Sequence, residues 1–188
     1  MIRICILGDI GSGKSYVAKQ FGYPVFNADY EVSKIYQKNR KCYNELKRKL
    51  PTHIINFPIK KTEITDAILS SIHNLKKIVK IVHPEVRSKL NSFIKKNKDK
   101  KFVVLDIPLL MENKLNKKKD VLIFVDANKK AINKRLKKRL NFNEKIINKL
   151  RKIQLPLERK KKYSHFIIKN NFKKNYVKKV VKEILLNA

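Results

Sequence analysis

The chain has 188 residues, of which 43% are hydrophobic and 33% are charged. This length suits one domain of ordinary size with room for an insertion, and the apolar content is enough to bury a core. No apolar run reaches the roughly 18 residues of a membrane span, the N-terminus lacks the features of a signal peptide, and two cysteines do not make a disulfide framework. We therefore expect a cytoplasmic α/β protein rather than a secreted, membrane-spanning or zinc-ribbon protein.

The charge is strongly unbalanced, because 47 Lys and Arg residues against 15 Asp and Glu residues give a formal net charge of +32. Such a balance attracts polyanionic ligands and is typical of many nucleic-acid-binding proteins. However, 39 of the 47 basic residues are Lys, and Lys, Asn and Ile together make up 80 of the 188 residues. An AT-rich coding sequence imposes this profile on any protein, and the lysines are spread along the chain. We interpret the charge as compositional bias and keep nucleic-acid binding as the alternative.

The N-terminal segment carries the clearest motif of the sequence. Three of the four glycines lie within six residues of one another: Gly8, Gly11 and Gly13. The segment that begins at Gly8 and ends at Ser15 fits the pattern G-x-x-x-x-G-K-[ST]. The apolar run over 2–7 predicts a buried parallel strand before it, and residues 15–21 predict a helix after it. Strand, glycine loop and helix are the context that the motif requires, and a chance glycine turn is the alternative.

The residue types of this loop fit the binding of ATP. Glycines let backbone N–H groups turn inward around phosphates, and a helix N-terminus adds partial positive charge. Lys14 would reach the β- and γ-phosphates, and the Ser15 hydroxyl would ligate Mg²⁺. We count Ser12, inside the loop, and Tyr16, directly after it, in the nucleotide-binding set. The motif predicts ATP and Mg²⁺ as ligands but does not identify the reaction.

The rest of the chain alternates between predicted strands and helices. In chain order these are a strand over 24–27, a polar and mostly helical stretch over 30–50, a loop over 51–61, helices over 65–82 and 84–94 that meet at His83-Pro84, a charged turn over 95–101, strands over 102–105 and 121–125, helices over 128–140 and 143–153, a strand over 166–168 and an amphipathic helix over 176–186. This alternation predicts an α/β fold with a doubly wound parallel sheet.

Aspartates follow three of the predicted strands. Ligands of such a sheet gather at the carboxyl ends of its strands, where Asp29, Asp106 and Asp126 lie. Asp29 is our best candidate for a base that acts on an acceptor hydroxyl, and a helix N-cap is the alternative. Asp106 is a candidate to hold Mg²⁺ through water, and a turn or cap residue before Pro108 is the alternative. We interpret Asp126 as a turn or cap residue, and the sequence leaves open whether Asp29 or Asp106 is the base.

Five segments, in order along residues 2 to about 171, resemble the dephospho-CoA kinase family of P-loop kinases. They are Ile10 to Ser15 of the phosphate loop, Asn27-Ala28-Asp29 where the family has Asp-Ala-Asp, Val82-His83-Pro84 where it has Leu-His-Pro, Ile107 to Asn113 with its Pro-Leu-Leu-x-Glu pattern, and Gln154, Glu158 and Arg159 followed by the strand 164–171 that ends in Asn170-Asn171. The phosphate loop alone is generic, whereas Pro-Leu-Leu-x-Glu together with His-Pro at this spacing is specific.

The resemblance implies a fold and a reaction. The fold is a three-layer P-loop NTPase with a parallel sheet, in which residues 1–188 make one kinase domain with a helical substrate-binding insertion over 30–95 and a helical lid over about 129–155. The reaction is ATP-dependent phosphorylation of the ribose 3′-hydroxyl of dephospho-CoA, the last step of coenzyme A synthesis. We expect dephospho-CoA and ATP as small-molecule substrates with Mg²⁺, no specific nucleic acid, no membrane, and a monomer or weak oligomer.

The resemblance also assigns residue roles. By this resemblance, Asp29, Lys14 and Arg135 act in catalysis. Arg139 and Asn170 bind ATP together with the phosphate loop, with Asn170 next to the adenine. The substrate is bound by His83, Pro108 and Leu109 together with Asp29. Two arginines retained in a chain that otherwise uses lysine fit planar, bidentate phosphate contacts. The alternatives are an exposed helix face for the arginines, a helix junction for His83, and core packing for Pro108 and Leu109.

The chain departs from the family pattern at a few positions. Asn27 replaces the first Asp of the family's pair, and Asp9 stands where the family usually has a second glycine, which puts a negative charge beside phosphates. Tyr16 replaces a Thr, and Ser164-His165 replaces Ala-Asp. Because Lys14, Ser15 and Asp29 are kept, we expect a working enzyme.

Two other classes remain open at this point. The first is a P-loop kinase that acts on another small hydroxyl or a nucleotide. The second is a nucleic-acid-binding P-loop ATPase, which the net charge of +32 suggests and which would bind RNA or DNA with a steep salt dependence. Against the second class, the sequence shows no basic patch interleaved with aromatic residues of the kind that stack bases.

Overall fold

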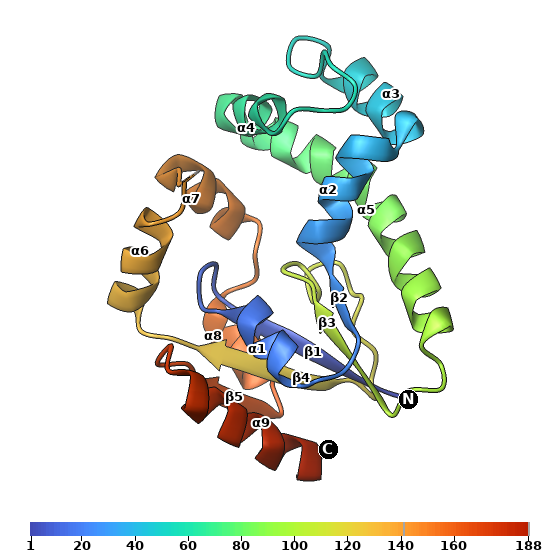
Figure 1. The fold of residues 1–188 in the computed structure, drawn as a ribbon. Coiled ribbons are helices and arrows are strands. Elements are labelled where there is room, and N and C mark those ends of the chain that lie inside the picture. Colours follow the sequence, from blue (N-terminus) through green and yellow to red (C-terminus); the bar gives the residue numbers. More distant parts are fainter. Residues whose placement is uncertain (141, 188) are drawn as a thin grey trace. The chain divides into compact units, whose positions relative to one another are not determined.

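The computed structural model (Figure 1) describes residues 1–140 and 142–187. The chain divides into two compact units. The sheet unit comprises Met1–Asn27, Asn97–Phe142 and Arg151–Ala188. The helical unit comprises Ala28–Lys96 and Asn143–Leu150.

Within residues 1–140 and 142–187, the sheet unit is built on five parallel strands. They are β1 (Ile2–Gly8), β2 (Val25–Asn27), β3 (Phe102–Asp106), β4 (Val121–Asp126) and β5 (Phe166–Lys169), in the order β2-β3-β1-β4-β5. All four pairings are parallel, so the predicted parallel sheet is confirmed. Strands β1 and β3 are almost continuously apolar because helices cover both faces of the sheet. This arrangement brings the carboxyl ends of all five strands to one edge.

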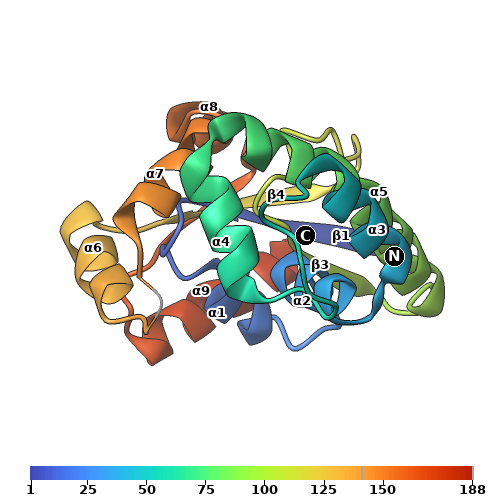
Figure 2. The same cartoon turned by 90° about the horizontal axis from the view of Figure 1, so that it is seen from above.

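The described part of the sheet unit has four helices of its own: α1 (Lys14–Gln20), α6 (Lys129–Lys137), α8 (Leu157–Lys162) and α9 (Lys174–Asn187). Helices α1 and α9 lie on one side of the sheet and α8 on the other, which Figure 2 shows from above. The three-layer architecture is therefore confirmed. Between the sheet and the pair α1 and α9 lies the main core, which includes Ile4, Ile6, Val17, Phe21, Val104, Ile123, Ile168, Val177 and Val181.

The helical unit packs around its longest helix. It contains α2 (Ala28–Lys38), α3 (Arg40–Lys49), α4 (Lys61–Ser70), α5 (Ile72–Lys96) and most of α7 (Glu144–Lys152). Helix α5 contacts α2, α3 and α4 through one apolar stripe at helical spacing. The buried residues of that stripe are Leu75, Ile78, Ile81, Val82, Val86 and Leu90.

One predicted helix boundary is wrong. We expected helices over 65–82 and 84–94 with a break at His83-Pro84, but α5 runs through Pro84 without interruption. The break lies at Ser71, which is extended (φ −157°, ψ 142°) and whose hydroxyl accepts a hydrogen bond from the His73 N–H at 3.0 Å. Proline removes one helical hydrogen bond, but Pro84 is exposed and the apolar stripe continues past it, so packing keeps the helix intact. The helix-junction alternative for His83 is therefore also wrong.

Two further features refine the predicted elements. The mostly helical stretch over 30–50 is confirmed and is divided at Asn39, whose side chain accepts a hydrogen bond from the Cys42 N–H at 2.9 Å. Helix α8 was not predicted. Its sequence, Leu-Glu-Arg-Lys-Lys-Lys, shows little apolar periodicity, so hydropathy alone does not reveal it.

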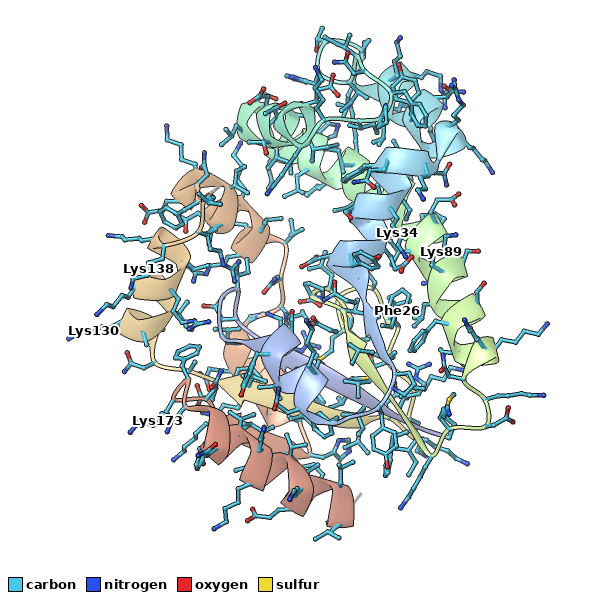
Figure 3. All side chains as sticks on the ribbon, viewed as in Figure 1. Phe26, Lys34, Lys89, Lys130, Lys138 and Lys173 are labelled. Carbon is cyan, nitrogen blue, oxygen red and sulfur yellow. The ribbon has the colours of Figure 1, made fainter. Side chains whose placement is uncertain are left out.

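Exposed lysines cover the outside of the sheet unit. Figure 3 shows Lys130, Lys138 and Lys173 pointing away from the ribbon, and all of them are exposed. Both cysteines are buried free thiols. Over residues 1–140 and 142–187, no helix is both long and apolar enough to cross a bilayer.

Candidate phosphate-binding site

The predicted phosphate loop joins the end of β1 to the start of α1. Gly11 and Gly13 have φ values of 86° and 95°, a region that favours glycine. A Cβ atom on Gly11 would come within 2.9 Å of Leu136 and 3.0 Å of Ile132, both buried residues of α6. A Cβ atom on Gly13 would collide with the side chain of Asn170. The glycines therefore allow both the loop conformation and the close packing of its neighbours.

Lys14 curls back over the loop that precedes it. Its Nζ donates to the carbonyl oxygen of Gly8 at 3.2 Å and to that of Asp9 at 2.7 Å, and the residue is only 9% exposed. These bonds hold the ammonium group at the mouth of the loop. Ser15, in the first turn of α1, is exposed.

One hydroxyl of the loop fits a site for a polar ligand. Within the described part of the chain, the hydroxyl of Ser12 is buried and has no hydrogen-bond partner; the same holds for the hydroxyl of Tyr16, whose side chain packs against the main core. Ser12 itself is 0% exposed. Buried polar groups are normally hydrogen-bonded, and an unsatisfied hydroxyl inside a glycine-rich loop at a helix N-terminus suits a phosphate oxygen.

Asn170 braces the loop from the end of β5. Its amide nitrogen Nδ2 donates to the Ser12 carbonyl at 2.8 Å, and its Oδ1 accepts from the Phe172 N–H at 2.9 Å. Its backbone N–H donates to the carbonyl of Asp126 at 2.6 Å. Because Asn170 is 3% exposed and fully engaged with the protein, its clearest action is to position the phosphate loop.

The first helix of the predicted lid packs beside the same loop. Arg135 is exposed on α6, and its guanidinium lies 4.4 Å from the centre of the Phe172 ring. Arg139 follows α6 and is also exposed. The apolar side of α6 rests on Gly11, so Arg135 lies on the exposed side of the helix.

The carboxyl ends of β2 and β3 place two polar side chains together. Asn27 and Asp106 are neighbours in register, and the Asn27 Nδ2 donates to Asp106 Oδ2 at 2.8 Å. Asp106 is 3% exposed. Asp126, at the end of β4, forms an ion pair with Lys161 at 3.2 Å. The cap of α6 is Asn128, which accepts from the N–H groups of two following residues, so the cap interpretation of Asp126 is wrong.

Asp29 and His83 belong to the helical unit. Helix α2 begins at Ala28, so Asp29 lies in its first turn and the N-cap alternative is wrong. Asp29 is exposed, two residues beyond the end of β2. His83 is half-buried on α5, and burial together with the Arg87 cation one turn later lowers its pKa. His83 is therefore held toward its neutral form.

The Pro-Leu-Leu-x-Glu segment is anchored by a buried lysine. Glu112 Oε1 accepts from Lys160 Nζ at 2.7 Å and from the Leu155 N–H at 2.8 Å. Lys160 also lies 3.5 Å from the carbonyl oxygen of Pro108. Pro108 and Leu109 are half-buried, so they combine a packing role with a partly accessible surface.

Two residues that contact the site escaped the sequence analysis. Lys160 is 1% exposed and pairs with Glu112, but in a chain with 39 lysines nothing in the sequence distinguishes it. Arg151 forms a two-point ion pair with Asp9, with its Nη2 2.9 Å from Oδ2 and its Nε 3.1 Å from Oδ1. Arginine is rare in this chain, with eight residues, and this rarity could have drawn attention to Arg151.

The available donors fit Mg²⁺ rather than a softer metal. The hydroxyl of Ser15 and the carboxylate of Asp106 are hard oxygen ligands, and Mg²⁺ in kinases is held by one or two such groups together with substrate phosphates. Among the described residues there is no cluster of three or more His, Cys, Asp and Glu side chains that could enclose a metal.

Comparison with known proteins decides the family. The sequence pattern of the family described as dephospho-CoA kinase matches residues 2–175. The dephospho-CoA kinase of Wolbachia pipientis wMel is 35% identical over 187 residues, which are 97% of this chain and 95% of that protein. The chain belongs to the dephospho-CoA kinase family. The dephospho-CoA kinase of Bacillus anthracis is 31% identical over 179 residues, 90% of this chain and 88% of that protein. The predicted enzyme class and reaction, an ATP-dependent kinase of coenzyme A synthesis, are confirmed.

Solved structures agree with this family fold. The Thermus thermophilus protein TT1252 superposes with a TM-score of 0.78 at 28% identity and covers 99% of this chain and 97% of its own. The dephospho-CoA kinase from Campylobacter jejuni has a TM-score of 0.64 at 21% identity, covering 98% and 95%. The deoxyadenosine kinase from M. mycoides has a TM-score of 0.54 at 17% identity, covering 99% and 100%. The last two show that the fold is that of P-loop kinases.

Proposed function

We propose that the sheet unit binds Mg-ATP at the loop between β1 and α1 and that the protein transfers the γ-phosphoryl group to the ribose 3′-hydroxyl of dephospho-CoA. The observation that carries the ATP half is the loop itself, with Lys14 held at its mouth and an unsatisfied Ser12 hydroxyl inside it. Membership of the family supports the choice of acceptor.

The phosphate loop supplies most of the positioning and charge. Its backbone N–H groups and the α1 N-terminus would hold the phosphates, and Lys14 would contact the β- and γ-phosphates. Ser15 and, through water, Asp106 would hold Mg²⁺. The cation, when bound, neutralises charge that develops on the phosphate oxygens. These groups act by positioning and electrostatic stabilisation, which are the main contributions to phosphoryl transfer.

The acceptor side depends on the helical unit. We assign Asp29 as the residue that orients the 3′-hydroxyl and receives its proton as the O–P bond forms and the bond to ADP breaks. His83, on α5, would contact the substrate, and its lowered pKa keeps it neutral at physiological pH. Pro108 and Leu109 would form an apolar wall for the same substrate. In this proposal the helical unit holds dephospho-CoA.

The lid arginines would complete the phosphate contacts. Arg135 and Arg139 lie on and just after α6 and are exposed, so their guanidinium groups are accessible to the triphosphate. The stacking of Arg135 on Phe172 gives it a defined resting position. Asn170 would lie beside the adenine and, through Ser12, hold the loop in shape.

The test is ADP release from Mg-ATP with dephospho-CoA as acceptor, and with AMP, CMP and pantothenate as control acceptors. Lys14→Ala and Asp29→Asn variants are measured in parallel. We expect only dephospho-CoA to stimulate turnover and both variants to lose that stimulation. Asp106→Asn is added to compare the two candidate carboxylates under the same conditions.

Other outcomes have definite meanings. Stimulation by AMP, CMP or pantothenate would mean that the protein phosphorylates a different substrate from the one proposed. Stimulation by RNA alone, with a steep salt dependence, would favour the nucleic-acid-binding ATPase and would contradict the proposal. Turnover that survives Asp29→Asn but not Asp106→Asn would assign the base to Asp106. Gel filtration of the same preparation tests the expected monomer or weak oligomer.

A further inference from the structure

The phosphate loop of this chain contains an acidic residue. Asp9 is the first residue after Gly8, and it is only 8% exposed. Its carbonyl oxygen accepts from Lys14 Nζ at 2.7 Å and from the Ser12 N–H at 3.2 Å, so Asp9 is part of the loop structure and not a residue on its margin. A carboxylate at this position adds a negative charge where the triphosphate of ATP is to bind.

Arg151 meets this carboxylate with two nitrogen atoms. Its Nη2 lies 2.9 Å from Asp9 Oδ2 and its Nε lies 3.1 Å from Oδ1. The Ile10 N–H donates to the same Oδ1 at 2.6 Å. Planar two-point pairing of this kind is the strongest geometry available to an arginine and a carboxylate. Both Asp9 oxygens are therefore engaged.

The Asp9–Arg151 ion pair is expected to affect the charge at the phosphate loop more than the stability of the fold. The Arg151 side chain is 37% exposed, and ion pairs at that exposure contribute little to stability. Together, however, the two side chains have no net charge, so the carboxylate beside the loop is balanced. A cavity of about 370 Å³ is lined by Asp9 and Arg151 and extends over Lys152 and Leu155, so the pair borders open space beside the loop.

We propose that Arg151 is a positioning residue for ATP that acts through Asp9: it neutralises the acidic side chain of the phosphate loop and so permits the triphosphate to bind. The proposal rests on the assignment of this loop to ATP. It requires that Arg151 be important only when residue 9 is acidic. Asp9 and Arg151 would then be a matched pair that substitutes for an uncharged residue in the loop.

The test is a double-mutant cycle read by equilibrium binding. Binding of a non-hydrolysable ATP analogue with Mg²⁺ is measured by calorimetry without any acceptor, for the wild type, Asp9→Asn, Arg151→Met and the double variant. The wild-type titration alone tests whether the chain binds ATP, and differences among the variants test the pair. Lys152→Met is the matched control, because it removes the same charge from the neighbouring, exposed residue.

We expect Arg151→Met to weaken binding about tenfold, because it leaves a bare carboxylate beside the phosphates. Asp9→Asn is expected to bind as tightly as the wild type or more tightly, and the double variant to return to within about threefold of the wild type. Lys152→Met should change the affinity less than about twofold, and high salt should shrink the Arg151→Met defect. In turnover assays the defect should appear in the KM for ATP and not in kcat.

Two results would overturn the proposal. A double variant as weak as Arg151→Met would mean that Arg151 contacts ATP itself. An Arg151→Met variant that behaves like Lys152→Met would mean that the pair is a surface ion pair without effect on the nucleotide. Urea unfolding of each variant accompanies the titrations, and Arg151→Lys separates charge from two-point geometry, because lysine keeps only the charge.

Discussion

Among the residues that the structure describes, the sheet unit contains two buried lysines, and their ammonium groups contact different kinds of acceptor. Lys14 is 9% exposed, and its Nζ donates to two neutral carbonyl groups of its own loop. Lys160 is 1% exposed, and its Nζ pairs with the Glu112 carboxylate at 2.7 Å. A carbonyl oxygen orients an ammonium group as a neutral acceptor, whereas a carboxylate also brings an opposite charge.

This difference separates a functional charge from a structural one. The Lys14 bonds lie within seven residues of sequence and follow from the loop conformation. The Lys160 pair joins α8 to the segment after β3, and the same Glu112 oxygen accepts from the Leu155 N–H at 2.8 Å. The first arrangement orients a cation at the candidate phosphate-binding site, and the second fixes helix α8 to the segment after β3. The variants below should therefore divide into losses of activity and losses of stability.

The largest effect is expected at Lys14. Lys14→Met keeps the length of the side chain but removes its charge and its two hydrogen bonds. We expect kcat/KM for ATP to fall about a thousandfold, because a positioned cation at the transferring phosphate is lost. The free energy of unfolding should change by about 1 kcal/mol or less. Steady-state kinetics and urea unfolding measure the two quantities, and a loss of several kcal/mol in stability would show that Lys14 is structural after all.

The opposite result is expected at Lys160. Lys160→Met should lower the free energy of unfolding by about 3 kcal/mol, because it leaves Glu112 buried without its counter-ion. The matched variant is Lys160→Met with Glu112→Gln, which removes both charges and keeps an oxygen for the Leu155 N–H. It should regain most of the loss. A double variant that is no more stable than the single one would locate the cost in packing of the lysine stem and not in the charge.

A smaller effect is expected at Glu63, a buried carboxylate whose oxygens accept several hydrogen bonds. Burial alone raises its pKa, but donors from the Asn56 backbone and side chain and from the backbone of Lys60 and Ile55 outweigh this, and the pKa is lowered. Glu63→Gln should cost about 2 kcal/mol at pH 7, since charge-assisted hydrogen bonds become neutral ones.

The pH dependence gives the sign of this effect. A lowered pKa means that the unfolded state binds more protons, so Glu63 stabilises the fold above its unfolded pKa of about 4.3 and loses this contribution as the pH falls through the folded value. The gap between wild type and Glu63→Gln should close below about pH 4. Glu45→Gln, at an exposed position on α3, is the control. A gap that stays constant with pH would exclude the carboxylate charge as its source.

Much of the sheet unit could be predicted from the sequence because its signals are local. The apolar run of β1, the glycines and the Lys14-Ser15 pair lie within 14 consecutive residues, and each has a direct physical meaning. The carboxyl-end position of Asp106 also follows from the strand pattern, and the structure adds its neighbour Asn27. Local patterning therefore predicts where the loop and the strand ends lie.

The remaining features depend on contacts between distant segments. The pairs Asp9–Arg151 and Glu112–Lys160 join residues 142 and 48 positions apart, and no spacing rule connects them. The break at Ser71 was missed because Pro84 is the stronger helix breaker on propensity, while packing of the apolar stripe of α5 decides the outcome. Because lysines are abundant in this chain, the sequence also gives little information about which lysine is buried.

The smallest effect is expected at a third buried charged residue, Asp106, which can be compared with Lys14 and Lys160. Its carboxylate accepts a hydrogen bond from the neutral amide of Asn27 at 2.8 Å. Asn27→Asp would place two carboxyl groups together, so one of them would keep its proton and have a raised pKa. A raised pKa means that the folded state binds more protons, so the variant should lose about 1 kcal/mol of stability relative to wild type between pH 5 and pH 8.

Mg²⁺ tests which kind of charge Asp106 carries. If Asp106 is a ligand-binding charge like Lys14, millimolar Mg²⁺ should restore that stability at pH 8, because the cation would bind to the two carboxylates. If it is a structural charge like Lys160, Mg²⁺ should have no effect. Urea unfolding at both pH values, with and without Mg²⁺, measures the difference, and an unchanged gap between pH 5 and pH 8 would show that the two side chains move apart instead.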